Sequence, residues 1–243
     1  MHADFKKIDL LILCGGLGKR LRPSLNDRPK VLAEIGGRVF LDILIGTISQ
    51  YSFQNIILST GYLKEQIKEH FGHNPNYNFL FSEEERPLGT GGAVQKAKPL
   101  IKSNPFLVMN GDSICKVNLE KFYDFHIAKK AILSVVLARS KEIADYGLVK
   151  VDASGRIRNF REKVREKGGG LISAGIYLMQ RNIFSCMPSK TCFSLESDLF
   201  SKILDERCYG FLCESELVDI GTPKRYKEAV KLFSNNGSKK GIL

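Results

Sequence analysis

The sequence lacks the features that mark secreted, membrane-spanning and metal-finger proteins. Its six cysteines include no C-x-x-C pair and show no paired metal-ligand spacing, so we expect reduced, mostly buried thiols in a cytoplasmic protein. The apolar run before the first glycines is too short for a signal-peptide core or a membrane span. No linker, repeat or low-complexity segment interrupts the 243 residues, which predicts one domain over residues 1–243.

Acidic residues are also scarce relative to basic ones. The 37 Lys and Arg residues exceed the 26 Asp and Glu residues, and the formal net charge is +11. Such a charge favours nucleic acid, an anionic membrane or a phosphorylated small molecule as the partner. The basic residues are spread along the chain, without the stripe interleaved with aromatic residues that is typical of nucleic-acid binders. We therefore expect no nucleic acid and no membrane, and interpret much of the charge as a solvated surface.

Short apolar runs alternate with stretches of helical period in the first half of the chain. This alternation predicts a mostly parallel sheet with helices on both faces, an α/β fold of three layers. The predicted strands are Asp9–Leu13, Asn55–Ser59, Asn78–Ser82, Phe106–Met109 and Ala131–Ala138, and helices are predicted over 39–51, 63–71 and 119–127.

The second half has a different pattern, which makes the predicted sheet mixed. A hairpin is predicted over 146–160, with turn residues at 152–155, and another strand over 171–179. A helix from about Ser194 to Glu206 and two short strands, Tyr209–Cys213 and Leu217–Ile220, should follow. The last helix should open with Thr222 as its N-cap and Pro223 at its first position.

A glycine-rich loop, LCGGLGKRLRPSLNDRPK over 13–30, follows the first predicted strand. It is not a dinucleotide fingerprint, because Leu21 stands where the third glycine belongs, and it is not a Walker A loop, because Arg20 follows Gly18-Lys19. Glycines expose backbone N–H groups to phosphates or a base edge, and the arginines and Lys30 add positive charge. A glycine turn with a solvated basic loop behind it is the simpler alternative.

Four further segments place charged or glycine residues at predicted strand ends. Asp112 follows a buried strand in NGD, and Asp219 ends a strand in VDIGTP, where carboxylates suit Mg²⁺. FREK over 160–163 sets an acid beside a base, and EEERPLGTGGA over 83–93 offers glycines that could leave a slot for a flat ring, with Thr90 as a helix cap. Alone, each also fits an ordinary turn or a solvated loop.

Together and in this order, these segments resemble the sugar-1-phosphate nucleotidylyltransferases. The resemblance rests on GGLGKRLRP followed by Pro29-Lys30, and on PLGTGGA, NGD, DYG, FREK, SAGIYL and VDIGTP, and it runs from about Ile8 to Val230. EEERPLGTGG, YGLVKVD and FSLESD are most similar to D-glycero-D-manno-heptose 1-phosphate guanylyltransferases. Mannose-1-phosphate guanylyltransferases and muramate-type uridylyltransferases are also similar.

The resemblance implies a Rossmann-like αβα fold of the nucleotide-diphospho-sugar transferase type. Its nucleotide-binding half would span about 1–113 and its sugar-phosphate-binding half about 114–235. It also implies in-line attack of a sugar 1-phosphate, most simply heptose 1-phosphate, on the α-phosphorus of GTP, with Mg²⁺ as cofactor and an NDP-sugar for surface glycan synthesis as product.

The family's functional positions carry over by motif to this sequence. Catalytic roles fall to Arg20, Lys30, Asp112, Lys163 and Asp219, with Asp112 and Asp219 as Mg²⁺ ligands. The nucleotide would be bound by Leu13, Gly15, Gly16, Gly18, Lys19, Glu84, Pro87, Gly89 and Thr90. The sugar phosphate would be bound by Asn110, Gly147, Glu162 and Ser173.

Three departures from the family pattern leave alternatives open. Lys19 replaces the usual Thr or Ser, Ser24 stands near a frequent threonine, and Ser173 takes the place where an asparagine often meets the sugar. Carboxylates at 83–85 could accept from guanine N1–H and N2–H₂, but uracil and thymine also present an N3–H. Mannose with GTP, a hexose with UTP or dTTP, and a catalytically silent nucleotide-sugar-binding subunit therefore remain, as does a homo-oligomer.

Overall fold

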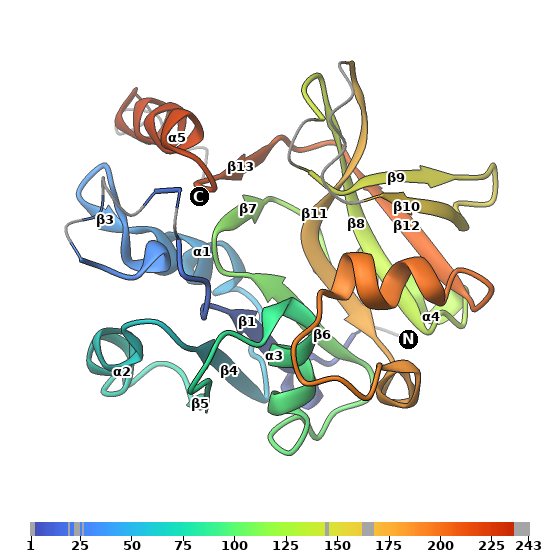
Figure 1. The fold of residues 1–243 in the computed structure, drawn as a ribbon, viewed down its shortest axis with the longest axis horizontal. Coiled ribbons are helices and arrows are strands. Elements are labelled where there is room, and N and C mark those ends of the chain that lie inside the picture. The colour runs from blue at the N-terminus through green and yellow to red at the C-terminus, as the bar shows by residue number, and fades with distance from the viewer. Residues whose placement is uncertain are drawn as a thin grey trace.

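A nine-stranded mixed sheet forms the centre of the molecule (Figure 1). The computed structural model describes residues 3–18, 20–21, 25, 27–143, 146–161 and 168–235. Four strands run parallel in the order β6–β1–β4–β5, and these are β1 (Asp9–Leu13), β4 (Asn55–Thr60), β5 (Phe79–Glu83) and β6 (Phe106–Asn110). Because they are parallel, their carboxyl ends meet at one edge, where the loops after β1 and β6 lie together.

The other half of the sheet is built on one long strand, β11 (Gly170–Met179). It runs antiparallel to β6, to β8 (Leu133–Ser140) and to the hairpin strand β9 (Leu148–Val151), which continues into β10 (Ile157–Arg161). β12 (Cys208–Cys213) extends the sheet parallel to β8. The register of β11 shifts between Ser173 and Tyr177, around Gly175 with a φ of 73°, a left-handed conformation that favours glycine.

Alternating side chains on the central strands separate two hydrophobic clusters. On β1, Leu10 and Ile12 belong to one cluster and Leu11 to the other, as expected for opposite faces of a sheet. The first cluster contains α1 (Phe40–Ile48), α2 (Lys64–Phe71), α4 (Leu119–Ala128) and part of α5 (Pro223–Asn235). The second contains α3 (Gly89–Ala97) and the helical turns between 181 and 203. The predicted three-layer αβα fold is confirmed.

Short elements complete the fold near the sheet's carboxyl edge. β7 (Ser113–Cys115) pairs antiparallel with β13 (Leu217–Asp219), and β2 (Glu34–Ile35) with β3 (Arg38–Val39). All six cysteines are free, and four of them are buried. Among the described residues, no helix is both long and apolar enough to cross a membrane.

The first five predicted strands lie within two residues of the observed ones. The predicted start of the last helix is confirmed, because the Thr222 hydroxyl accepts from the Arg225 N–H at 3.3 Å. The predicted helix over 194–206 is wrong: Leu195–Leu199 is a π-helical turn and Phe200–Lys202 a 3₁₀ turn. Leu195, Leu199 and Phe200 are all buried in the second cluster, and the Leu195 N–H donates to the Thr90 hydroxyl, so tertiary contacts set the conformation of this segment.

His126, a fully buried residue of α4, should make stability depend on pH. Its Nδ1 lies 2.8 Å from Ser134 Oγ and its Nε2 lies 3.2 Å from Gln180 Nε2. Burial lowers the pKa of His126 to about 4. The unfolded chain, with an ordinary histidine pKa of about 6.5, binds the proton more readily, so stability falls as pH drops below about 6.5.

We therefore expect His126 to reduce the free energy of unfolding by about 2 kcal/mol between pH 7 and pH 5. Urea unfolding at both pH values should show this loss in the wild type and in His73→Gln, which removes an exposed histidine. The loss should be smaller in His126→Gln. An unchanged loss in that variant would refute the assignment.

Candidate active site

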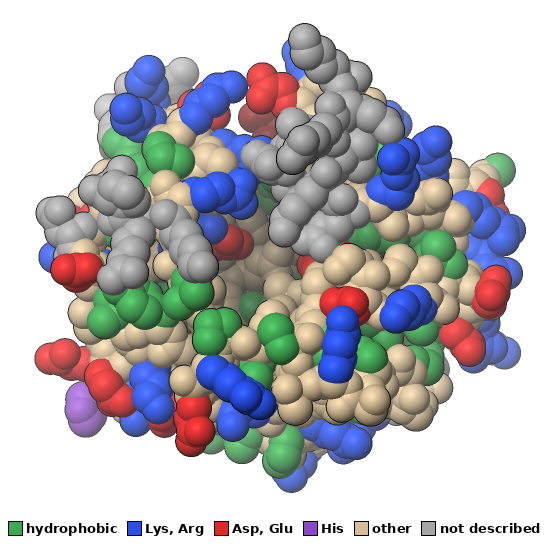
Figure 2. Space-filling model, viewed as in Figure 1, with side chains coloured by type: hydrophobic (Ala, Val, Ile, Leu, Met, Phe, Trp, Pro, Cys, Tyr) green, Lys and Arg blue, Asp and Glu red, His purple; other side chains and the backbone are tan. Residues whose placement is uncertain are grey.

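Two adjoining cavities open at the carboxyl ends of β1 and β6, where Figure 2 shows the face hollowed near its centre. The first has a volume of about 410 Å³ and the second of about 340 Å³. They share four lining residues: Lys30, Thr90, Asn110 and Asp112. A molecule in one cavity would therefore meet a molecule in the other at a cation and a carboxylate.

The first cavity collects the residues predicted to bind the nucleotide. Its lining includes Leu13, Gly15, Gly16, Gly18, Glu84, Pro87, Gly89 and Thr90. Lys19 lies outside the described residues. A Cβ at Gly15 would come within 2.8 Å of Glu84 Oε1, so any other residue here would displace the Glu84 carboxylate.

Glu84 is the one carboxylate of the 83–85 run that lines this cavity. Its Oε1 accepts from the Ser59 hydroxyl at 3.2 Å and its Oε2 from the Leu88 N–H at 3.1 Å. Burial raises the pKa of Glu84. Glu83 instead pairs with Lys64 and Lys68 at 2.8 and 3.1 Å. The sequence suggested three carboxylates that could bind a base, and of these Glu84 lies in the first cavity.

The glycines of PLGTGGA hold a neighbouring segment. A Cβ at Gly89 would lie 2.5 Å from Phe193 O, one at Gly91 2.2 Å from the Phe193 ring, and one at Gly92 2.3 Å from Thr191 O. Residues 191–193 lie where side chains at these glycines would stand, whereas Gly89 also lines the first cavity with Pro87, so the slot for a flat ring stays a prediction.

Thr90 does not cap α3, as the sequence suggested, because α3 begins at Gly89. The Thr90 hydroxyl instead accepts from the Leu195 N–H at 2.8 Å and donates to Glu196 at 3.0 Å. Sequence reasoning missed this because Thr90 and Glu196 are far apart in the chain. Hydrogen bonds of Thr90 therefore connect the start of α3, which lines the first cavity, to Glu196 in the wall of the second.

The second cavity gathers the predicted catalytic and sugar-phosphate residues. Among its lining residues are Arg20, Lys30, Asn110, Asp112, Gly147, Ser173 and Asp219. Glu162 and Lys163, also predicted here, lie outside the described residues. Arg225, Tyr146, Tyr177 and Glu196 also line it and were not predicted as site residues.

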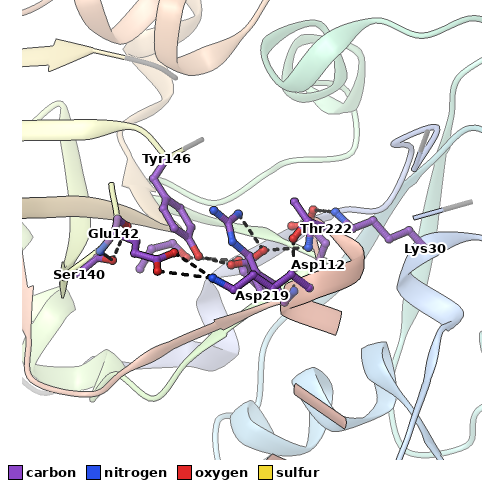
Figure 3. Close-up of polar contacts among 12 residues, drawn as sticks. Lys30, Asp112, Ser140, Glu142, Tyr146, Asp219 and Thr222 are labelled. Carbon is purple, nitrogen blue, oxygen red and sulfur yellow. Dashed lines mark hydrogen bonds and ion pairs between the residues drawn. The ribbon is translucent and has the colours of Figure 1, made fainter. Parts of the chain in front are cut away.

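Asp112 and Asp219 are brought together by strand pairing. β13 pairs with β7 so that Asp219 lies opposite Ser113, and the Ile220 N–H donates to the Asp112 carbonyl at 3.1 Å. Lys30, from the end of the glycine loop, forms an ion pair with the Asp112 carboxylate (Figure 3). Two carboxylates and a lysine from three distant segments thus form one cluster.

The Asp219 carboxylate is held from several sides. It accepts from the Tyr146 hydroxyl (Figure 3), from the Gly221 N–H at 2.8 Å and from the Arg225 guanidinium at 3.4 Å. The guanidinium lies 4.1 Å from the centre of the Tyr146 ring. Burial and the nearby carboxylate raise the pKa of Tyr146, so its hydroxyl remains a donor. The DYG motif contained Tyr146, but only the fold shows its partner.

The carboxylates of Asp112 and Asp219 fit a Mg²⁺ ion whose other ligands would be phosphate oxygens. Carboxylate oxygens are the donors that Mg²⁺ prefers, and it usually keeps one or two of them together with phosphate and water. Among the described residues there is no cluster of three or more His, Cys, Asp or Glu side chains that could hold a metal alone. Space beside Asp219 is open because residue 221 is glycine; a Cβ there would lie 2.8 Å from Asp219 Oδ1.

Hydroxyl groups line the side of the second cavity near Glu196. The Ser173 hydroxyl donates to the Tyr177 hydroxyl at 3.2 Å, which donates to Glu196 Oε1 at 2.8 Å. Burial raises the pKa of Tyr177 well above its ordinary value. Since the Ser173 proton is used within this chain of bonds, Ser173 presents an acceptor lone pair to the cavity and not the donor that an asparagine amide would supply.

Comparisons with known proteins show the family of the chain. Residues 10–236 match the model of the nucleotidyl transferase family, and the chain belongs to that family. The D-glycero-alpha-D-manno-heptose 1-phosphate guanylyltransferase of Aneurinibacillus thermoaerophilus is 36% identical over 226 residues, covering 92% of this chain and 97% of that protein. The mannose-1-phosphate guanylyltransferase of Mycobacterium tuberculosis is 30% identical over 90% of this chain and 63% of its own length.

A solved structure shows the same fold. The crystal structure of HddC from Yersinia pseudotuberculosis complexed with GMP-PN matches with a TM-score of 0.80 and 31% identity, covering 93% of this chain and 99% of that one. The family resemblance and the fold class inferred from the sequence are both confirmed.

Two Gly→Ala changes should have opposite effects on stability, because one lies where residues 191–193 pack on α3 and the other lies on the exposed side of α1. Gly91→Ala places a methyl group against the buried Phe193 ring, and such overpacking costs about 1–3 kcal/mol. Gly46→Ala, within α1, meets its nearest atom, Arg38 Nη2, at 3.7 Å and should stabilise the helix by up to about 1 kcal/mol. Denaturant unfolding of both variants measures the difference; equal stabilities would show that the contact with Phe193 is not tight.

Proposed function

We propose that this protein transfers a guanylyl group from GTP to a sugar 1-phosphate and releases pyrophosphate. The observation that carries the proposal is the shared wall of two adjoining cavities, which presents Lys30 and Asp112 to both. A triphosphate in the glycine-lined cavity and a sugar phosphate in the second would meet there. The guanylyltransferases among the relatives support this choice of reaction.

In the proposed reaction, a phosphate oxygen of the sugar 1-phosphate attacks the α-phosphorus in line, and the bond to pyrophosphate breaks. No covalent enzyme intermediate is needed, so the protein positions both substrates and neutralises their charge. Exposed N–H groups of the glycine loop and the side chains of Arg20 and Lys30 would bind the triphosphate. A Mg²⁺ ion held by Asp112 and Asp219 would supply further charge neutralisation at the phosphates.

Heptose 1-phosphate is the sugar that we propose as the substrate. The relative from A. thermoaerophilus is named for this sugar, and the chain spans nearly all of it. In the second cavity, the Glu196 carboxylate lies among hydroxyl groups and can accept from sugar hydroxyls. Glu84, the carboxylate of the first cavity, can accept from the N–H groups of guanine.

Mannose 1-phosphate is the second candidate sugar, favoured by the relative from M. tuberculosis. A catalytically silent nucleotide-sugar-binding subunit accounts less well for the site. Such a protein has no chemical need for the two carboxylates of Asp112 and Asp219 in one cavity with Lys30.

Asp112→Ala should lower kcat on the order of 10²-fold or more, because it removes one preorganised charged group from the reacting phosphates. The assay is pyrophosphate release, and circular dichroism confirms folding. Asp124→Asn, on the exposed side of α4, is the matched control and should retain wild-type turnover. Near-wild-type turnover in Asp112→Ala would remove Asp112 from the mechanism.

A matrix of four nucleoside triphosphates against several sugar 1-phosphates tests substrate choice. GTP with D-glycero-D-manno-heptose 1-phosphate should give the highest kcat/KM. Preference for mannose 1-phosphate would keep the reaction but change the sugar. Preference for UTP or dTTP would contradict guanine as the base, although Glu84 could still accept from N3–H. Absence of Mg²⁺-dependent turnover with every pair would favour the silent subunit.

A further inference from the structure

Each carboxylate of the predicted metal site already has a cation of the chain beside it. Lys30 forms an ion pair with Asp112, and Arg225 lies 3.4 Å from Asp219 Oδ1. Both cations are shielded from solvent, with 13% of the Lys30 side chain and 17% of the Arg225 side chain exposed. At this depth the pairs are screened less by water and salt than surface pairs are.

Arg225 is held beside Asp219 by its surroundings. It stands in the first turn of α5, where its N–H donates to the Thr222 hydroxyl. Its guanidinium lies against the Tyr146 ring, and the Tyr146 hydroxyl donates to the other oxygen of Asp219. In the free protein, the cation–π contact with Tyr146 and the hydrogen bond to Asp219 favour this position of the guanidinium.

Arg225 also faces the substrates. It lines the second cavity together with Arg20 and Lys30. The Arg225 guanidinium therefore lies beside a carboxylate that it can neutralise. It also lines the cavity in which phosphates would attract it. A divalent cation arriving alone would be repelled by Arg225, whereas a triphosphate would draw the guanidinium away from Asp219.

We propose that Arg225 balances the charge of Asp219 in the free enzyme and thereby makes metal binding depend on the nucleotide. The inference rests on the proposed function, since it requires a nucleotide and a divalent ion at this site. Arg225 acts through Asp219, so it is a charge-balancing residue and need not contact the reacting atoms.

The test measures binding of Mn²⁺ alone, without nucleotide, from the electron paramagnetic resonance signal of the free ion. Arg225→Gln should bind Mn²⁺ about tenfold more tightly than the wild type, because a neighbouring positive charge is gone. Arg225→Lys should remain as weak as the wild type. A residue with a merely structural role would give weaker binding, not tighter, when it is replaced.

Lys224→Gln is the matched control. It removes the same charge one residue away, from a side chain that is 67% exposed and pairs with Glu142 at 3.4 Å. Its Mn²⁺ affinity should stay within twofold of the wild type. Thermal melts report folding of each variant, and Arg225→Met, which keeps the apolar stem against Tyr146, replaces Arg225→Gln if that variant is unfolded.

Mn²⁺ affinity in Arg225→Gln or Arg225→Met that is unchanged, weaker or still undetectable would overturn the inference. Titration of the wild type with GTP in the presence of Mg²⁺ separates this failure from failure of the proposed function. If the wild type binds GTP while the Arg225 variants bind Mn²⁺ no better, only the role of Arg225 falls. If the wild type does not bind GTP at all, the proposed function falls with it.

Discussion

The hydrogen bond from the Ile220 N–H to the Asp112 carbonyl is the contact on which the site depends. It continues the pairing of β7 with β13 and joins the loop after a central strand to the entry of the last helix. Asp112, Asp219 and Gly221 take their places around it. Without this junction, Asp219 would not be held beside Lys30 and Asp112 in the second cavity.

Charge in this cluster is balanced within the chain. Lys30 faces Asp112, and Arg225 faces Asp219 with Tyr146 completing the contact. Phosphates and a divalent ion that bind here would have to replace these two ion pairs. Because each of these two cations faces a carboxylate, the cluster adds nothing to the net charge of +11, which comes from basic residues elsewhere in the chain.

The strands could be predicted from the sequence because apolar runs such as Asp9–Leu13 are buried on both faces and differ clearly from the amphipathic helices between them. Motif order then located most residues of both cavities. The contacts of Thr90 and Arg225 could not be predicted, because each is made with a residue that only tertiary folding brings near. The turn at Leu195–Leu199 departs from the helical pattern because packing overrides local propensity there.

Residues 191–196 supply Glu196 to the second cavity and contact Gly89 and Thr90, which line the first. Phe193 is clamped against the glycines of α3, and three residues further on Glu196 stands at the hydroxyl-lined wall of the second cavity. The Thr90 hydroxyl binds both the backbone and the carboxylate of this segment. If a base binds in the first cavity and a sugar in the second, their recognition would share this one segment, and a substitution at Glu196 that changes the sugar would also act on the contacts of α3 beside the nucleotide.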